Sequence, residues 1–435
     1  MRPGLQLKAR LREWLRWLIP GMGVKRWFGL QLLGTTLVGL GLAYLLIDFY
    51  RDVAMPWLPG VLTLQFLPRA MRGLLLGGLG LALTLLAIAQ INRNVLAPFV
   101  RPGQSVAQAV SEHRRRGRGP KIVAIGGGTG LSTLLRGLKA HTSNLTAIVT
   151  VADDGGSSGR LRQTLGVLPP GDFRNCIAAL ADDEALTTQL FQYRFGGRED
   201  VGGHSFGNLF ITAMAEVAGS FEKGLLESSK VLNIRGRVVP STLSDVTLIG
   251  EVVGEGQAVA VVTGESKITE TRGQIRRVRL QPEDPPAYPG AVRALLEADL
   301  IVLGPGSLYT SLLPNLLVPD LTAAIKASRA LKVYVCNTAT QPGETDGYSV
   351  LDHVRAIERH TERGLFPLVL ANVNQRGTLL PHLNWVTVDA PANGALQVIA
   401  ADLADAAYPW RHDATKLAAV LISLLETTDY AIRTT

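Results

Sequence analysis

Residues 121–130, KIVAIGGGTG, decide the fold of this 435-residue chain. The first five residues are mostly apolar, as in a buried strand of a parallel sheet, and a five-residue run with four glycines follows directly. Leucines at 131, 134, 135 and 138 then recur at the spacing of one helix face. A strand, a glycine turn and a helix in this order predict the opening unit of a parallel α/β domain.

The glycine turn has the chemistry of an anion-binding site. Backbone N–H groups at the start of a helix attract phosphate together with the helix dipole, and glycines let the backbone approach closely. The stricter patterns fail, because a GxGxxG frame would require glycine at Leu131 or Thr133, and no Lys-Ser/Thr pair follows as in a Walker A loop. The turn therefore predicts phosphate binding without the dinucleotide fingerprint, with a purely structural turn as the alternative.

A second predicted strand, residues 145–151, runs into two aspartates, Asp153 and Asp154. In open α/β sheets ligands bind beyond the carboxyl ends of the strands, and an acid after the second strand commonly holds a sugar hydroxyl. The two carboxylates are also suited to Mg²⁺ beside a phosphate, and either one is a good cap for the following helix. We expect one aspartate to cap that helix and the other to contact the ligand.

Later stretches extend the same pattern. Residues 300–303, LIVL, lead into GPGS at 304–307, and two glycine turns facing one cleft would embrace a diphosphate. Residues 332–336 form a further apolar strand that ends at Asn337, whereas valine-rich residues 250–280 indicate a small β-rich insert. The predicted fold is α/β and Rossmann-like, with a mostly parallel sheet, helices on both faces and this insert.

Polar side chains also occur where helices are expected to begin. Arg174, beside Asp172, can clamp a phosphate with two hydrogen bonds, although a local Asp–Arg pair is equally consistent with the sequence. His204 and Asn208 open another predicted helix and Arg411 precedes a third, with a structural histidine and a salt-bridged arginine as the alternatives. No GxSxG nucleophile motif is present, which favours a ligand-binding regulator over a hydrolase, while metal-assisted group transfer stays open.

Charge and cysteine content exclude other classes. The net charge is +8, but residues 1–120 alone carry +12, which leaves the remainder at −4 and without the electrostatic footprint of a nucleic-acid-binding domain. The two distant cysteines, Cys176 and Cys336, form neither a CxxC motif nor a disulfide framework. The seven histidines do not cluster at the spacing of zinc ligands.

Two uncharged apolar runs, residues 27–47 and 73–91, have the length of membrane-spanning helices. Basic residues flank both outer ends, so the positive-inside rule places both termini and the main domain in the cytoplasm, in a two-pass protein of the inner (plasma) membrane. The expected organisation is a membrane anchor at 1–98, a basic juxtamembrane linker at 99–119 and a nucleotide-binding domain at 120–435. Two buried core helices are the alternative for the apolar runs.

Several blocks of the sequence resemble the YvcK/CofD-like family, and specifically its YvcK branch of gluconeogenesis factors. The blocks span residues 121–416 in order: IGGGTGLSTLLRGLK, TAIVTVADDGGSSGRLR, PPGDFRNCIAAL, GHSFGNLFITAM, SKVLNIRGRVVP, VTGES, IVLGPGSLYTSLLPNLLV, CNTATQPGETDGYS and RHDATK. The resemblance implies UDP-sugar binding and control of carbon metabolism, cell-wall precursor supply and cell shape. The CofD branch instead transfers a phospholactyl group to a deazaflavin with a metal ion. The membrane hairpin and the poorly matching stretch 365–389 depart from the family pattern.

The leading hypothesis is a non-catalytic regulator whose effector is a nucleotide sugar of the UDP-N-acetylglucosamine type, with no required cofactor. Its expected partners are the lipid bilayer, cytoplasmic proteins of carbon or envelope metabolism, and further copies of itself, but not nucleic acid. The rival is a Mg²⁺-dependent 2-phospholactate-type transferase acting on a deazaflavin, for which Asp153 and Asp154 are the candidate metal ligands.

The residues expected at the ligand lie in glycine turns, after strands or at helix starts. They are Gly126, Gly127, Gly128, Thr129, Gly130, Asp153, Asp154, Gly155, Gly156, Ser157, Arg160, Asp172, Arg174, Asn175, His204, Asn208, Gly304, Gly306, Ser307, Asn337, Arg411 and His412.

Overall fold

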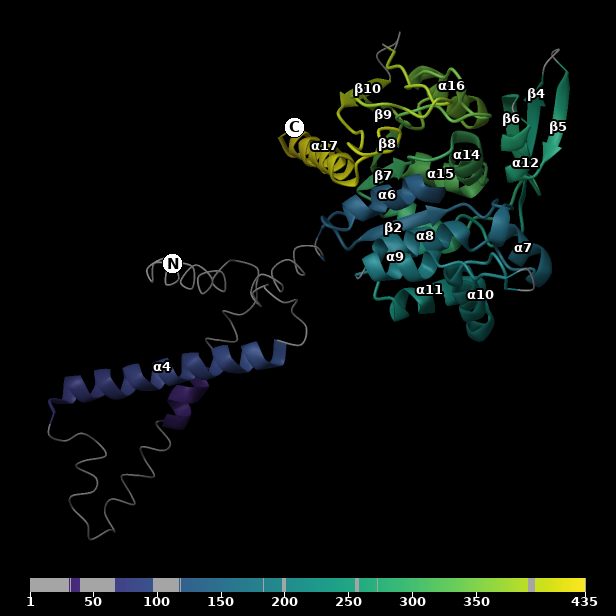
Figure 1. The fold of residues 1–435 in the computed structure, drawn as a ribbon. Helices are drawn as coiled ribbons and strands as arrows, with labels where there is room; N and C mark the ends of the chain where they lie inside the picture. The colour runs from purple at the N-terminus through teal and green to yellow at the C-terminus, as the bar shows by residue number, and fades with distance from the viewer. Residues whose placement is uncertain are drawn as a thin grey trace. The chain divides into compact units, whose positions relative to one another are not determined.

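The computed structural model describes residues 31, 33–39, 67–96, 117, 119–182, 184–197, 201–254, 258–271, 273–389 and 396–434 (Figure 1). The chain divides into two compact units, Met1–Arg115 and Arg116–Thr435. The first unit contributes one long described helix, α4 (Arg69–Leu96).

The predicted membrane hairpin is not supported. Of the first expected span, 27–47, only residue 31 and residues 33–39 are described, and the second span, 73–91, lies within α4. Among the described residues no helix combines the length and the apolar character that crossing a bilayer requires. The predicted two-pass membrane location is therefore wrong.

The second unit is built around a seven-stranded sheet in which all neighbouring strands are parallel. The strand order is β10-β9-β8-β7-β1-β2-β3. The strands are β1 (Ile122–Gly126), β2 (Leu145–Val149), β3 (Arg237–Pro240), β7 (Leu300–Leu303), β8 (Leu331–Val335), β9 (Leu368–Asn372) and β10 (Gln397–Ala401). β1, β2 and β7 are buried along their whole length, which explains their continuous apolar sequences. The predicted parallel α/β architecture is confirmed.

Helices connect these strands and cover the sheet (Figure 1). They are α6 (Gly128–Leu138), α7 (Gly156–Leu165), α8 (Gly171–Leu180), α9 (Glu184–Gln192), α10 (Phe206–Ala218), α11 (Phe221–Val231), α13 (Pro289–Leu296), η2 (Leu308–Leu312), α14 (Leu313–Leu316), α15 (Pro319–Ala327), α16 (Val350–His360) and α17 (Ala414–Thr434). α6 packs against α8 and α17, whereas α13 packs against α15. Because the chain moves outward from β1 in one direction and from β7 in the other, right-handed crossovers place these two groups on opposite faces.

The predicted β-rich insert is present as a separate three-stranded antiparallel sheet in the order β5-β4-β6. Its elements are β4 (Thr247–Val253), β5 (Val259–Thr263), β6 (Gln274–Gln281) and the short helix α12 (Glu265–Glu270). Ile275, Val278 and Leu280 of β6 are buried, as expected when one face of a small sheet packs on a core, and a shift in register separates the first from the other two.

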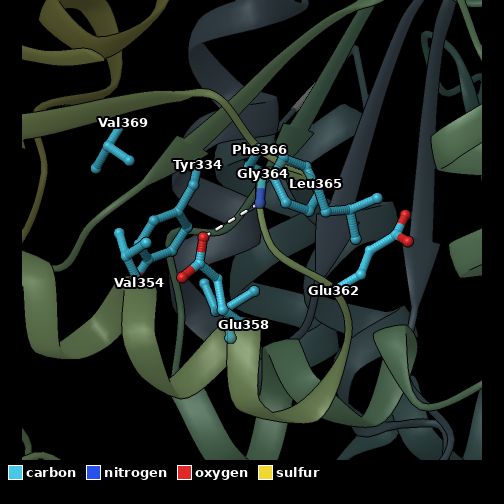
Figure 2. Close-up of a pocket in the computed structure, with 9 residues that line it drawn as sticks. Tyr334, Val354, Glu358, Glu362, Gly364, Leu365, Phe366 and Val369 are labelled. Atoms are coloured by element: carbon cyan, nitrogen blue, oxygen red, sulfur yellow. Dashed lines mark hydrogen bonds between the residues drawn. The ribbon is translucent and has the colours of Figure 1, made fainter. Parts of the chain in front are cut away.

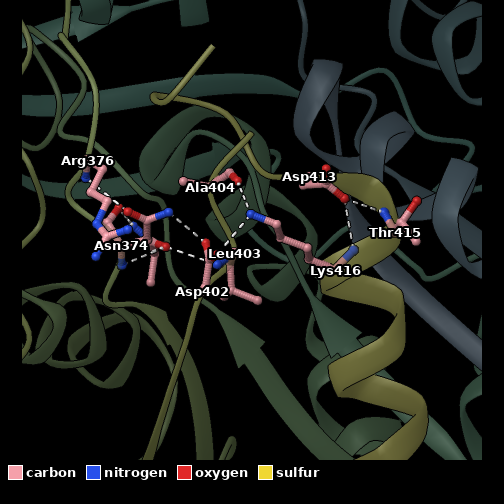
Figure 3. A network of polar contacts seen from close by, with 9 residues as sticks. Asn374, Arg376, Asp402, Leu403, Ala404, Asp413, Thr415 and Lys416 are labelled. Atoms are coloured by element: carbon pink, nitrogen blue, oxygen red, sulfur yellow. Dashed lines mark hydrogen bonds and ion pairs between the residues drawn. The ribbon is translucent and has the colours of Figure 1, made fainter. Parts of the chain in front are cut away.

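A network of polar contacts connects helix α17 to the ends of strands β9 and β10 (Figure 3). Asp413 caps α17 by accepting hydrogen bonds from the backbone N–H groups of Thr415 (2.8 Å) and Lys416 (2.9 Å), as its sequence position predicts. The Lys416 ammonium donates to Asp402 (2.9 Å), which also accepts from Asn374 (3.0 Å). Asp402 follows β10 and Asn374 follows β9, so the network joins both strand ends to α17.

Gly137 determines how closely α17 can approach α6. A Cβ at this position would lie 2.8 Å from the Ala414 carbonyl carbon and 2.9 Å from the Ala418 Cβ. Overpacking of this kind costs about 1–3 kcal/mol, and the better helix propensity of alanine returns at most about 1 kcal/mol. Because the new Cβ meets backbone, the upper end of the cost applies, and we expect Gly137→Ala to lower the free energy of unfolding by about 2 kcal/mol in urea titrations.

The control is Ala419→Val, which adds bulk to an exposed position of the same helix and should change stability by about 0.5 kcal/mol or less. Equal stability of Gly137→Ala and the wild-type chain would contradict the tight helix contact.

Candidate functional site

The strand order reverses between β1 and β7, and this is where an open α/β sheet forms a crevice for ligands. From β1 the chain proceeds to β2 and β3 on one side, and from β7 it proceeds to β8, β9 and β10 on the other (Figure 1). The carboxyl ends of β1 and β7 lead into the two glycine turns, residues 126–130 and 304–307. The predicted binding edge therefore coincides with the topological switch point.

The two glycine turns lie in direct contact. A Cβ on Gly130 would overlap the Pro305 carbonyl group, with the carbonyl carbon at 2.7 Å and the Gly306 nitrogen at 3.0 Å. A Cβ on Gly306 would in turn lie 3.4 Å from the Gly127 carbonyl oxygen. Glycine is required at Gly130 because backbone packs on backbone there, and Gly128 adopts a φ of +65°.

Asp172 covers the start of α6. Its carboxylate accepts a hydrogen bond from the Gly128 N–H, and it lies so close to Gly127 that a Cβ there would collide with it. Burial raises the pKa of Asp172 to about 7, and the neighbouring charge of Asp153 adds to the shift. The Gly128 N–H, which the sequence analysis expected to bind a phosphate, is thus hydrogen-bonded to the Asp172 carboxylate.

Asp153 and Asp154 have different neighbours. Asp153 accepts from the Gly155 N–H (2.9 Å) just before α7, and burial raises its pKa. Asp154 accepts from both the backbone N–H (3.0 Å) and the hydroxyl (2.7 Å) of Ser266, and so binds the insert to the strand end. Burial, followed by the charge of Asp153, raises the pKa of nearby Glu265 to about 8. Among the described residues no group of three or more His, Cys, Asp or Glu side chains has the arrangement of a metal site.

A third carboxylate caps the helix that follows the second glycine turn. Glu344 is buried and accepts from the Tyr309 N–H (3.1 Å) and the Thr310 hydroxyl (2.9 Å), and burial raises its pKa. Asn337, at the end of β8, holds the turn itself by accepting from the Gly306 N–H (3.3 Å) and donating to the Gly306 carbonyl (2.9 Å). Both glycine turns and the start of α7 therefore have N–H groups bonded to acidic or amide side chains.

The other predicted residues gather on α7, α8 and α10. The Ser157 hydroxyl lies 2.9 Å from His204 Nδ1 and accepts from the Asn208 amide (3.0 Å). Burial lowers the pKa of His204. Arg174 donates to Asn175 (3.0 Å) on the same side of the cleft. This pairing of a hydroxyl with a neutral imidazole has no sequence motif, and the sequence analysis missed it.

His412 lies beside the end of β8, and Arg411 precedes it. His412 is buried and its Nε2 donates to the Cys336 carbonyl (3.1 Å), while burial lowers its pKa to about 4. The exposed Arg411 guanidinium lies 5.5 Å from the centroid of the Tyr408 ring. In this structure His412 fixes the strand end, and Arg411 stacks on its own loop.

Two cavities within the described part of the chain lie apart from the glycine turns. Figure 2 shows one of about 10 Å³ behind β8, where Glu358 accepts from the Gly364 N–H (3.1 Å), which is room for about one water molecule. A wider groove of about 680 Å³ lies between β6 and α15 and is lined by Arg277 and Lys326 among others. Neither contains a residue of the two glycine turns.

Sequence reasoning missed four polar residues of this edge. Glu265, Ser266 and Glu344 lie in stretches that carry the family resemblance, but their roles depend on contacts with distant segments. Gln341, which donates to the Ser307 hydroxyl (2.7 Å), lies in the same block of the sequence as Glu344. In the sequence around these residues, the signal that could have indicated them is an acidic residue inside a turn between apolar segments.

Comparison with known proteins identifies the family. The model of the family described as 2-phospho-L-lactate transferase CofD matches residues 122–428. The gluconeogenesis factor of Bacillus subtilis is 52% identical over 256 residues, covering 59% of this chain and 80% of that protein. A protein of Nostoc sp., also named as a gluconeogenesis factor, is 50% identical over 374 residues, covering 83% of this chain and 80% of its own.

A solved structure supports the same assignment. The protein of the UPF0052 family from Bacillus halodurans is 43% identical, with a TM-score of 0.65, and the alignment covers 70% of this chain and 99% of that one. The chain belongs to the CofD family, in the branch of the gluconeogenesis factors.

Proposed function

We propose that this gluconeogenesis factor acts by binding a nucleotide sugar of the UDP-N-acetylglucosamine type, and that it reports the level of this ligand to protein partners of carbon or envelope metabolism. One observation carries the proposal: at the switch point, partly buried carboxylates (Asp153, Asp172) lie near arginines of α7 and α8. Carboxylates accept hydrogen bonds from sugar hydroxyls, and guanidinium groups bind phosphate. A ligand with hydroxyls at one end and a diphosphate at the other complements both groups.

We expect the proposed regulator to bind its ligand without a metal. The test is calorimetric titration of the full-length chain with UDP-sugars, NAD, GDP and a deazaflavin, each with and without a chelator. We expect a UDP-sugar to bind most tightly and the chelator to leave its affinity largely unchanged. Selective binding of NAD, or loss of all binding on chelation, would contradict the proposal.

One observation favours the transferase as a second candidate. A carboxylate with a pKa near 7, such as Asp172, has the proton affinity of a general base for an acceptor hydroxyl. Incubation with a phospholactyl donor, a deazaflavin acceptor and Mg²⁺ tests this directly. Formation of the phospholactyl product would replace the regulator proposal, whereas unchanged donor alongside tight UDP-sugar binding supports it.

A further inference from the structure

Three arginines from three different segments converge on the loop at residues 202–205. Arg160 of α7 donates to the Gly202 carbonyl (3.1 Å), and Arg194, which follows α9, donates to the Gly203 carbonyl (3.0 Å). Arg174 of α8 donates to the Ser205 hydroxyl (2.7 Å). The three guanidinium groups therefore surround four consecutive residues, which we call the arginine loop.

The backbone holds the arginine loop in place. Residues 193–195 run antiparallel to residues 203–206, with hydrogen bonds from Phe195 N–H to the His204 carbonyl (3.0 Å) and from Gly203 N–H to the Phe195 carbonyl (2.9 Å). This pairing places Arg194 opposite Ser205, the residue that Arg174 contacts. The cationic side chains are thus organised before any ligand arrives.

Positive charge is concentrated at the arginine loop, and the charges of Asp172 and Asp153 oppose it near Arg174. Within the described ranges, none of the three arginines forms an ion pair with a carboxylate. Burial, and then the charge of Arg194, lowers the pKa of Arg174, as expected where like charges crowd. Each guanidinium has five N–H donors, and only some of these donors bond to the neutral oxygens of the arginine loop. Such a cluster is suited to an oxyanion.

The glycine turns have the opposite character. Carboxylates of Asp172, Asp153 and Glu344 bond to N–H groups at the starts of α6, the α7 turn and η2. A phosphate placed there would meet negative charge and would have to displace an existing hydrogen bond. The neutral hydroxyls of a sugar meet no such repulsion, because they donate to carboxylates.

We propose that the diphosphate of the ligand binds at the arginine loop, through Arg160, Arg174 and Arg194, and that its hydroxyl-bearing part lies toward the carboxylates at the glycine turns. This placement is the reverse of the usual dinucleotide arrangement, in which the pyrophosphate rests on the first glycine turn. The identity of the whole ligand rests on the proposed function, whereas the anion site does not. Arg194 thereby becomes a binding residue that no motif indicates.

The test uses inorganic pyrophosphate as the probe, titrated calorimetrically into the full-length chain. Arg160→Ala and Arg194→Ala remove exposed side chains, and each should weaken pyrophosphate binding tenfold to a hundredfold, the loss expected for a hydrogen bond to a charged group. The matched control is Arg279→Ala, an exposed arginine of the insert that pairs with Glu283, and it should bind within twofold of wild type. Thermal unfolding verifies that each variant is folded.

The outcomes separate this inference from the proposed function. Wild-type affinity for pyrophosphate in both Arg160→Ala and Arg194→Ala, or no pyrophosphate binding by the wild-type chain at millimolar concentration, overturns the arginine site. The same variants are then titrated with UDP-N-acetylglucosamine. If the arginine variants bind the UDP-sugar as tightly as the wild-type chain, the proposed function stands and the arginine site is wrong. If pyrophosphate binding depends on the arginines but no UDP-sugar binds, the arginine site stands and the proposed function is wrong.

Discussion

Replacing Asp172 by asparagine should stabilise the chain by about 4 kcal/mol at pH 8 but by less than about 2 kcal/mol at pH 5. The folded-state pKa of Asp172 is about 7, against an ordinary value of 3.8. A carboxyl group whose pKa is raised on folding favours the folded state fully only below its unfolded pKa, and this contribution is lost as the pH rises through 7. At about 1.4 kcal/mol per pKa unit, the difference between the two pH values is about 3 kcal/mol. Asparagine has the same shape and does not ionise.

Urea unfolding of both chains at pH 5 and pH 8 measures this difference. Asp402→Asn is the control, because hydrogen bonds from Asn374 and Lys416 lower the pKa of Asp402. The contribution of Asp402 is present above its unfolded pKa and is lost only as the pH falls, so it should stay constant between pH 5 and 8. A gain for Asp172→Asn that is the same at both pH values would show that the buried carboxylate is not the source.

Gly130→Val should both destabilise the domain and weaken ligand binding. The new Cβ would lie 2.7 Å from the Pro305 carbonyl carbon, and neither backbone can move aside without separating the two glycine turns. Overpacking costs about 1–3 kcal/mol, and the upper end is expected where both partners are backbone. Because a displacement of about 1 Å in a binding site can cost a hundredfold, we also expect UDP-sugar affinity to fall by at least tenfold.

Calorimetry and urea unfolding measure the two effects of Gly130→Val separately. Gly254→Val is the matched control, because a Cβ at that exposed position of the insert meets no atom within 4 Å. It should bind like the wild-type chain. Wild-type stability and affinity in Gly130→Val would mean that the contact between the turns does not shape the cleft.

Much of the fold could be predicted because its signals are local. The buried strands β1 and β7 are short apolar runs followed at once by glycines, and the β-rich insert differs in composition from its surroundings. The switch point also follows from these two glycine turns. The membrane prediction failed where it relied on apolar length alone, since among the described residues no helix qualifies as a span.

The chemistry of the cleft could be predicted only in part. The sequence indicates which polar residues follow the strands, but not which N–H groups they bind. Asp172 lies 44 positions beyond Gly128, and Glu344 lies 35 positions beyond Tyr309, so only the folded chain brings each acid to its helix start. The sequence analysis did not single out Arg194, because an arginine in a connection has no pattern until a backbone bridge sets it beside Ser205.

The parallel strand order also has a consequence for how the chain is made. β1 can pair with β2 soon after both leave the ribosome. Its other neighbour, β7, follows roughly 180 residues later in the chain. At about 5–20 residues per second, translation takes on the order of 10–35 seconds to supply that partner. Throughout this interval one edge of a wholly apolar strand is unpaired, and such an edge is a template for pairing with another chain. We therefore expect this protein to depend most on chaperones during translation, while β1 lacks its partner β7.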